Sequence, residues 1–192
     1  PRGSLHSRSR IPEVSLAFLA SVVGLSFLAG TASLPLPSKL PVSSRGWFVL
    51  LVVLTEFNDM AQAWWGRALG SRPLAPKISP RKTWEGLLGG LATTSAVALV
   101  VCPALTSWGR MEPPGLQLGV PGWVWSLGLG LVVALCGVAG DLAASALKRG
   151  AGLKDAGRLL PGHGGVLDRF DSITVTAPVY FLLTWILWSP AP

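Results

Sequence analysis

The sequence predicts an all-α fold, a polytopic membrane helix bundle with about five transmembrane helices. Two observations predict it. Half of the 192 residues are apolar and only 13% are charged, with a mean hydropathy of +0.52, whereas soluble domains carry about 25% charged residues. The few charges also lie outside several long apolar runs. Together these features indicate organisation for a membrane rather than a large soluble core.

Five apolar runs approach the roughly 20 residues that a helix needs to cross the hydrocarbon layer. They are residues 14–31, 46–65, 86–108, 123–140 and 172–188. The second run contains Glu56, Asn58 and Asp59, and we keep it as a span because polar residues inside a membrane face a cavity or a partner helix and mark function. Residues 1–13 are predicted to form a basic N-terminal tail ahead of a membrane-embedded domain of residues 14–192.

Glycines recur on two of the predicted helices. Gly86 and Gly90 form a GxxxG pair, and the fourth run contains Gly128, Gly130, Gly137 and Gly140. Small residues let membrane helices approach closely. We therefore expect these glycines to pack helices rather than to touch a substrate.

The distribution of Lys and Arg orients the predicted bundle. Thirteen of these residues lie in the tail and in two loops, 66–85 and 141–171, and three lie in the alternate connections. The positive-inside rule places the basic loops, and with them the candidate site, in the cytoplasm and the C-terminus outside. The net charge of +7 fits this topology and attraction to anionic lipid heads, and it also fits phosphate substrates. Nucleic acid is not expected, since no recognition module accompanies the charge.

The loop 141–171 contains the densest group of reactive residues. If the fourth helix continues past Gly140, then Asp141, Ser145 and Lys148 line one of its faces at the membrane surface. Asp168 and Asp171 are three residues apart at the start of the fifth helix. Carboxylates on two facing helix ends suit Mg²⁺, which takes one or two carboxylates together with substrate phosphates. The remaining phosphate oxygens would be held by the neighbouring basic residues, Lys148, Arg149, Lys154, Arg158 and Arg169.

The loop 66–85 predicts an anion site. Ser79 followed by Pro80 is typical of a helix N-cap with proline at the first helical position. A helix N-terminus beside Lys82 and Thr83 would bind a phosphate at the cytoplasmic rim, although capping alone explains Ser79 equally well.

The polar residues of the second run have two possible interpretations. Asn58 and Asp59 would bind a cation or brace the site through Arg67. A pair such as Glu56 and Asp59 would also occur in a transporter.

Two blocks of the sequence resemble the phosphatidate cytidylyltransferase family. One is Ser145-x-x-Lys148-Arg149-x4-Lys154-Asp155, continued by Pro161-Gly-His-Gly-Gly-x2-Asp168-Arg169-x-Asp171. The other comprises Asn58-Asp59, Gly66-Arg67 and the stretch 76–86, Pro-Lys-Ile-Ser-Pro-Arg-Lys-Thr-Trp-Glu-Gly. Together they cover about residues 50–175.

The resemblance implies nucleotidyl transfer from CTP to phosphatidic acid, giving CDP-diacylglycerol and pyrophosphate at the surface of a lipid bilayer. It implies a Mg²⁺ centre on Asp141, Asp168 and Asp171, with a second cation left open, and catalytic roles for these aspartates and Lys148. The implied substrate-binding residues are Ser79, Lys82, Thr83, Ser145, Arg149, Lys154, Arg169, Asn58 and Asp59. A homodimer stays open.

The sequence departs from the family pattern in two respects. Family members are normally longer at the N-terminus, and this chain begins with Pro1, so we expect a fragment or a shortened product. Gln62 stands where many members have smaller or aromatic residues, which points to a subfamily with a different lipid preference.

Three alternatives remain at this stage. A CDP-alcohol phosphotransferase would carry a longer aspartate pattern, which is absent. A secondary transporter would explain Glu56 and Asp59 but not the glycine-rich loop. A truncated, inactive family member would act only as a membrane-assembly partner.

Overall fold

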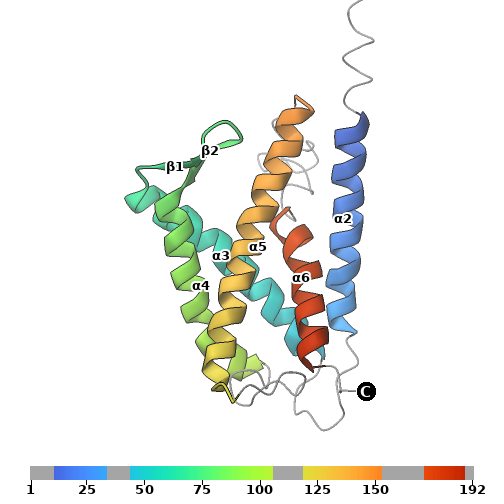
Figure 1. Ribbon diagram of the computed structural model, residues 1–192, viewed down its shortest axis with the longest axis vertical. Coiled ribbons are helices and arrows are strands. Elements are labelled where there is room, and N and C mark those ends of the chain that lie inside the picture. Colours follow the sequence, from blue (N-terminus) through green and yellow to red (C-terminus); the bar gives the residue numbers. More distant parts are fainter. Residues whose placement is uncertain (1–10, 34–43, 106–118, 153–170, 189–192) are drawn as a thin grey trace, which may run out of the picture.

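The computed structural model describes residues 11–33, 44–105, 119–152 and 171–188, and within them the chain is a helical bundle with one short β hairpin (Figure 1). The helices are α2 (Ile11–Ala32), α3 (Ser44–Leu69), α4 (Trp84–Leu105), α5 (Gly122–Gly150) and α6 (Asp171–Trp188). Each of the five apolar runs contributes one of these helices, so the mainly helical prediction is confirmed. Helix α2 begins inside the stretch expected to be a tail.

Two of these helices, α4 and α5, are long and apolar enough to cross a membrane. Helix α6 and residues 18–32 of α2 are apolar but shorter than that length. Five spans therefore stay a prediction, of which the described residues support two.

Helix α3 runs obliquely through the bundle and passes behind α5 in Figure 1. It packs mainly against α4, while α5 contacts both α4 and α6, and α2 packs along α6. The first half of α3 forms the centre of the core, where Trp47, Leu50 and Leu54 are fully buried. The Tyr180 hydroxyl of α6 donates a 2.9 Å hydrogen bond to the carbonyl of Trp47, which ties α6 to α3.

Glycines allow the close helix contacts that the sequence predicts, except at Gly128, where a Cβ would have nothing within 4 Å. A Cβ atom at Gly86 would lie 2.8 Å from the carbonyl oxygen of Gln62, and one at Gly90 would lie 2.5 Å from the Gln62 side chain. At the start of α6, a Cβ at Gly140 would lie 2.6 Å from the carbonyl oxygen of Asp171. These separations are too short for a side chain, so glycine is what lets α4 approach α3 and α6 approach α5.

The purely α-helical expectation is wrong between α3 and α4. Strand β1 (Pro73–Ala75) pairs antiparallel with β2 (Ser79–Thr83), with Pro73 opposite Thr83 and Ala75 opposite Ser79. Ser79 therefore lies in a strand and is not the cap of α4. Thr83 takes that place, because its Oγ1 accepts a 3.1 Å hydrogen bond from the Gly86 N–H. Pro80 lacks an N–H, a feature that suits an edge strand as well as a first helical turn.

Candidate active site

Four elements bring charged side chains together near the hairpin. Asp59 comes from α3, Asp141 from α5, Asp171 from the first residue of α6, and Lys82 from β2. The Lys82 Nζ forms an ion pair with Asp141 Oδ2, and both side chains are about one-fifth exposed. Lys148, farther along α5, places its Nζ 3.8 Å from Asp171 Oδ2. Because these charges are partly removed from water, they interact more strongly than an exposed pair would.

Ser172 joins two of the carboxylates. Its Oγ lies 2.6 Å from Asp141 Oδ1 and 2.7 Å from Asp59 Oδ2. A hydroxyl has a single proton, so Ser172 can donate to only one of these oxygens at a time. The second short distance, from the Ser172 Oγ to the other carboxylate oxygen, then needs a proton on that carboxylate or a nearby cation to offset the repulsion between the two oxygens. Ser172 thus fixes the spacing of two negatively charged groups that would otherwise repel each other.

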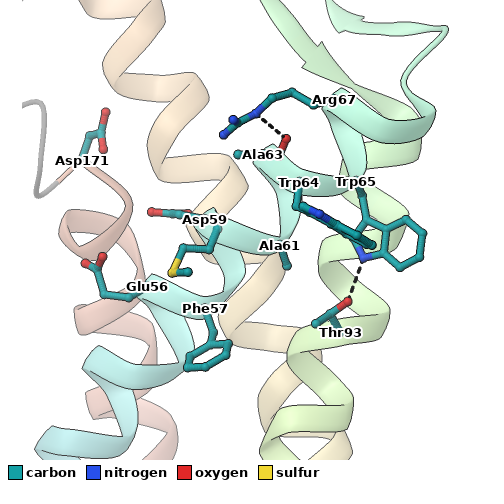
Figure 2. A pocket seen from close by; sticks show the side chains of 11 residues that line it. Glu56, Phe57, Asp59, Ala61, Ala63, Trp64, Trp65, Arg67, Thr93 and Asp171 are labelled. Carbon is teal, nitrogen blue, oxygen red and sulfur yellow. Dashed lines mark hydrogen bonds between the residues drawn. The ribbon is translucent and has the colours of Figure 1, made fainter.

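Two cavities meet at Asp59. The larger has a volume of about 810 Å³, and Figure 2 shows Asp59 between Asp171 and Glu56 on one side and the tryptophans on the other. The smaller has a volume of about 270 Å³ and reaches Asp141 and the hairpin. Asp59 and Ala63 line both cavities. A ligand in one cavity therefore lies next to a ligand in the other.

The two cavities differ in chemistry. The larger one has aromatic and apolar walls, including Phe57, Met60 and Trp64, with Arg67 at one end. The smaller one is polar and partly basic, with walls that include Ser79, Arg81, Lys82, Thr83 and Gln62. The first suits a lipid and the second suits a phosphorylated ligand.

The carboxylates offer a hard cation one or two oxygen ligands rather than a complete site. Within the described residues, no group of three or more His, Cys, Asp or Glu side chains is placed to hold a metal ion. The Asp59 Oδ1 atom is nevertheless buried without a hydrogen-bond partner among these residues, and Asp141 and Asp171 lie nearby. Mg²⁺ commonly binds one or two carboxylates and takes its other oxygens from substrate phosphates and water. Asp59 thereby joins the carboxylate group in which the sequence placed Asp141, Asp168 and Asp171.

The structure separates some of the predicted residues from this cluster. Asn58 is fully buried and lines neither cavity. Its Nδ2 donates to the carbonyl of Ala134 at 3.4 Å, and its Oδ1 accepts from Thr94 Oγ1 at 3.3 Å. Asn58 therefore ties α3 to α4 and α5 instead of facing a ligand.

The expected link between Asp59 and Arg67 is also different. Arg67 Nε donates to the carbonyl of Ala63 on its own helix at 3.1 Å (Figure 2), whereas Asp59 contacts Ser172. Arg67 is left at the wall of the larger cavity.

The remaining predicted residues are placed only in part. Helix α5 does continue to Gly150, which puts the half-buried Ser145 and Lys148 on the same face as Asp141, while Arg149 is exposed. The predicted residues Lys154, Arg158, Asp168 and Arg169 lie outside the described residues.

Sequence reasoning missed Ser172 and the walls of the cavities. Ser172 directly follows Asp171 in the sequence, and this position next to a candidate carboxylate could have marked it as a site residue. Phe57, Met60 and Trp64 recur at helical spacing and are exposed, which also could have indicated a groove. Gln62, which the resemblance connected with lipid preference, lines the smaller polar cavity.

Comparison with known proteins identifies the family of the chain. The model of the cytidylyltransferase family matches residues 5–187. The chain is 40% identical over 182 residues to uncharacterized protein YnbB of Escherichia coli (strain K12), covering 94% of this chain and 55% of that protein. It is 38% identical over 174 residues to a phosphatidate cytidylyltransferase of Haemophilus influenzae, covering 90% of this chain and 57% of that one.

A third relative, a phosphatidate cytidylyltransferase of Pseudomonas aeruginosa, is 40% identical over 149 residues, covering 78% of this chain and 51% of that protein. The chain thus spans about half the length of the curated relatives it matches. The matched region includes all four elements that form the carboxylate cluster. The chain belongs to the cytidylyltransferase family.

Proposed function

We propose that this chain carries the site that transfers the cytidylyl group of CTP to phosphatidic acid, giving CDP-diacylglycerol and pyrophosphate. One observation carries the proposal: Asp59, Asp141, Asp171 and Lys82 converge where a polar cavity and an apolar cavity meet. The names of the Haemophilus and Pseudomonas relatives support the same reaction.

The smaller cavity suits the triphosphate of CTP. Arg81 and Lys82 supply positive charge there, and Ser79 and Thr83 supply hydroxyl groups. The Gln62 Nε2 atom is buried without a hydrogen-bond partner among the described residues, so a donor is available for a ligand oxygen. Binding a phosphate would give the Gln62 Nε2 atom an acceptor.

The larger cavity suits phosphatidic acid. Phe57, Met60 and Trp64 offer an apolar wall for an acyl chain, and Arg67 offers a cation for the headgroup phosphate. Because this cavity shares Asp59 with the smaller one, the lipid phosphate would approach the nucleotide near the carboxylate cluster.

The reaction needs positioning and neutralisation of charge more than a strong base. A phosphate oxygen of the lipid forms a bond to the α-phosphorus of CTP, while the bond from that phosphorus to the pyrophosphate oxygen breaks. The phosphate monoester is already an anionic nucleophile. Lys82 and Lys148 would reduce the repulsion between substrates and carboxylates.

Mg²⁺ fits the carboxylate cluster. One or two of Asp59, Asp141 and Asp171 would hold it together with substrate phosphates and water, because no three ligating side chains among the described residues are placed to bind one ion. Asp168 is a further predicted ligand. When bound, it would supply neutralisation of the triphosphate and of the leaving pyrophosphate.

The same proposal gives the arrangement in the membrane. All five helices would cross or enter the bilayer, and the hairpin and the C-terminal end of α5 would face the cytoplasm. The excess of Lys and Arg in the loops 66–85 and 141–171 supports this orientation.

Release of pyrophosphate by the purified full chain in detergent, with CTP, phosphatidic acid and Mg²⁺, tests the reaction. Asp141→Asn keeps the shape of the side chain but removes the charge that pairs with Lys82. We expect lipid-dependent release by the wild type and a loss of about 100-fold or more in the variant. Cys136→Ala, on the same helix, is the matched control and should keep wild-type activity.

Two outcomes would contradict the proposal. Pyrophosphate release that does not depend on the lipid would exclude phosphatidic acid as the acceptor. Absence of release from wild-type protein with a cooperative thermal transition would exclude the reaction for this chain and leave the assembly-partner alternative.

A further inference from the structure

The β hairpin is fastened at its base by one side chain from α4. Glu85 Oε2 accepts hydrogen bonds from the N–H groups of Ser71 at 3.1 Å and Arg72 at 3.2 Å. Glu85 Oε1 accepts a 2.6 Å hydrogen bond from the Ser71 hydroxyl. The N–H of Trp84 donates to the carbonyl of Arg72 at 3.0 Å beside these bonds. A single carboxylate thus holds the segment that enters β1 against the first turn of α4.

This attachment is separate from the cavity. Glu85 lines neither of the two cavities and has no part in the carboxylate cluster. Its partners, Ser71 and Arg72, lie ahead of β1 and are exposed. The hairpin that they begin contains Ser79, Arg81, Lys82 and Thr83, the residues that β2 contributes to the smaller cavity.

The hairpin is small, and among the described residues its second strand packs on α3, α4 and α5. Its two strands are three and five residues long, and an isolated two-stranded hairpin is only marginally stable in water. In the described part of the chain, its polar attachments to the bundle include the Lys82–Asp141 ion pair, the Thr83 cap, the Trp84–Arg72 backbone hydrogen bond and the Glu85 hydrogen bonds. The first of these would be competed for by an anionic ligand, because Lys82 also lines the cavity.

We propose that Glu85 is a positioning residue that holds the β1–β2 hairpin in the orientation in which Arg81 and Lys82 meet the phosphates of the nucleotide. Glu85 acts through the backbone of residues 71 and 72 and does not touch the substrate. The link to a nucleotide rests on the proposed function, whereas the link to the hairpin rests on the hydrogen bonds alone.

Two variants separate the role of the hydrogen bonds from the role of the charge. Glu85→Ala removes all three bonds. Glu85→Gln keeps an oxygen for the two N–H groups, and its amide can donate to the Ser71 hydroxyl. We therefore expect Glu85→Gln to stay close to the wild type. Leu88→Ala, one turn along α4 at a side chain that is 61% exposed, is the matched control.

Limited digestion with trypsin tests the hairpin without any assay of activity. Cleavage after Arg81 or Lys82 requires the strand to open locally. We expect Glu85→Ala to be cut at these positions about tenfold faster than the wild type, since hydrogen bonds to a charged acceptor are lost. Glu85→Gln and Leu88→Ala should be cut at the wild-type rate. Equal cleavage of Glu85→Ala and the wild type would overturn the proposal.

Steady-state kinetics tests the positioning. We expect Glu85→Ala to raise KM for CTP about tenfold and to leave KM for phosphatidic acid and the thermal transition of the bundle unchanged. A fall in kcat with both KM values unchanged would overturn the positioning role, because it would indicate only a smaller folded fraction. If Glu85→Ala is cleaved faster while the wild-type chain releases no pyrophosphate, the proposed function is refuted and the role of Glu85 in the hairpin is supported.

Discussion

Ser172 contacts two carboxylates of the site with one small side chain. Its hydroxyl lies between Asp59 and Asp141, which belong to helices that are far apart in the sequence. Removing the hydroxyl would leave two carboxylates facing each other without a bridge. Mutation of a group that supports a charged site in this way typically lowers the affinity or activity of the site by about 10- to 100-fold.

We therefore predict that Ser172→Ala lowers kcat by about 10- to 100-fold with little change in the thermal transition. Thr184→Val removes another buried hydroxyl of α6, which donates to carbonyls of its own helix, and should keep wild-type kcat. Pyrophosphate release with saturating substrates measures both. Equal losses in the two variants would mean that any buried hydroxyl of α6 is needed for folding.

At the same scale, the sequence could nominate candidate site residues but could not show which of them meet. Asp141 and Asp171 could be chosen because charged residues at a membrane boundary next to glycines are unusual. The partnership of Lys82 with Asp141 could not, since it depends on where β2 brings a lysine that is 59 residues away. Asn58 looked like a ligand for the same reason as Asp59, and only their neighbouring helices distinguish them.

Among the elements, the junction of α5 and α6 sets how closely the carboxylates approach. Gly140 directly precedes Asp141 and faces the backbone of Asp171 and Ser172, whereas Gly128 has open space at its Cβ position. The two glycines lie on the same helix. Replacing each glycine by alanine therefore compares the free-energy cost of crowding at Gly140 with the gain in helix propensity at Gly128.

We predict that Gly140→Ala destabilises the bundle by about 1–3 kcal/mol through overpacking. Gly128→Ala should be neutral or stabilising by up to about 1 kcal/mol, because alanine favours a helix more than glycine does. Thermal unfolding in detergent, followed by circular dichroism, measures both. A destabilised Gly128→Ala together with an unchanged Gly140→Ala would contradict the close approach of α6 to α5.

The hairpin shows why an element can be missed although its residues are identified. Ser79 and Pro80 satisfy the local preferences of a helix N-terminus, and nothing in the sequence near them favours a strand. The strand forms because β1 is available as a partner and because Glu85 fastens the turn from α3. Both conditions involve residues outside the motif, so local propensity predicted the wrong structure for Ser79.

For the molecule as a whole, the apolar runs predicted the number and order of the described helices. They did not predict the oblique course of α3, because hydropathy reports which residues avoid water and not the angle at which helices cross. That course is what brings Asp59 near α6 and gives the two cavities a common wall.

The predicted orientation of the bundle has a direct test. We expect a cysteine introduced by Lys77→Cys, in a Cys102→Ala and Cys136→Ala background, to react with a membrane-impermeant maleimide only after cells are permeabilised. Lys77 is exposed between β1 and β2. Arg110→Cys, in the connection predicted to lie outside, is the control and should react in intact cells. Labelling at position 77 in intact cells would show that the orientation is the reverse of the predicted one.

The contribution of α6 has a consequence for the order in which the protein is made. Asp59, Lys82 and Asp141 leave the ribosome before Ser172. A nascent chain that ends between α5 and α6 would already contain the Lys82–Asp141 partners and most of both cavity walls. It would lack the hydroxyl that spaces Asp59 from Asp141, so its carboxylates would have no fixed separation. Completion of the site is therefore a late event of biosynthesis.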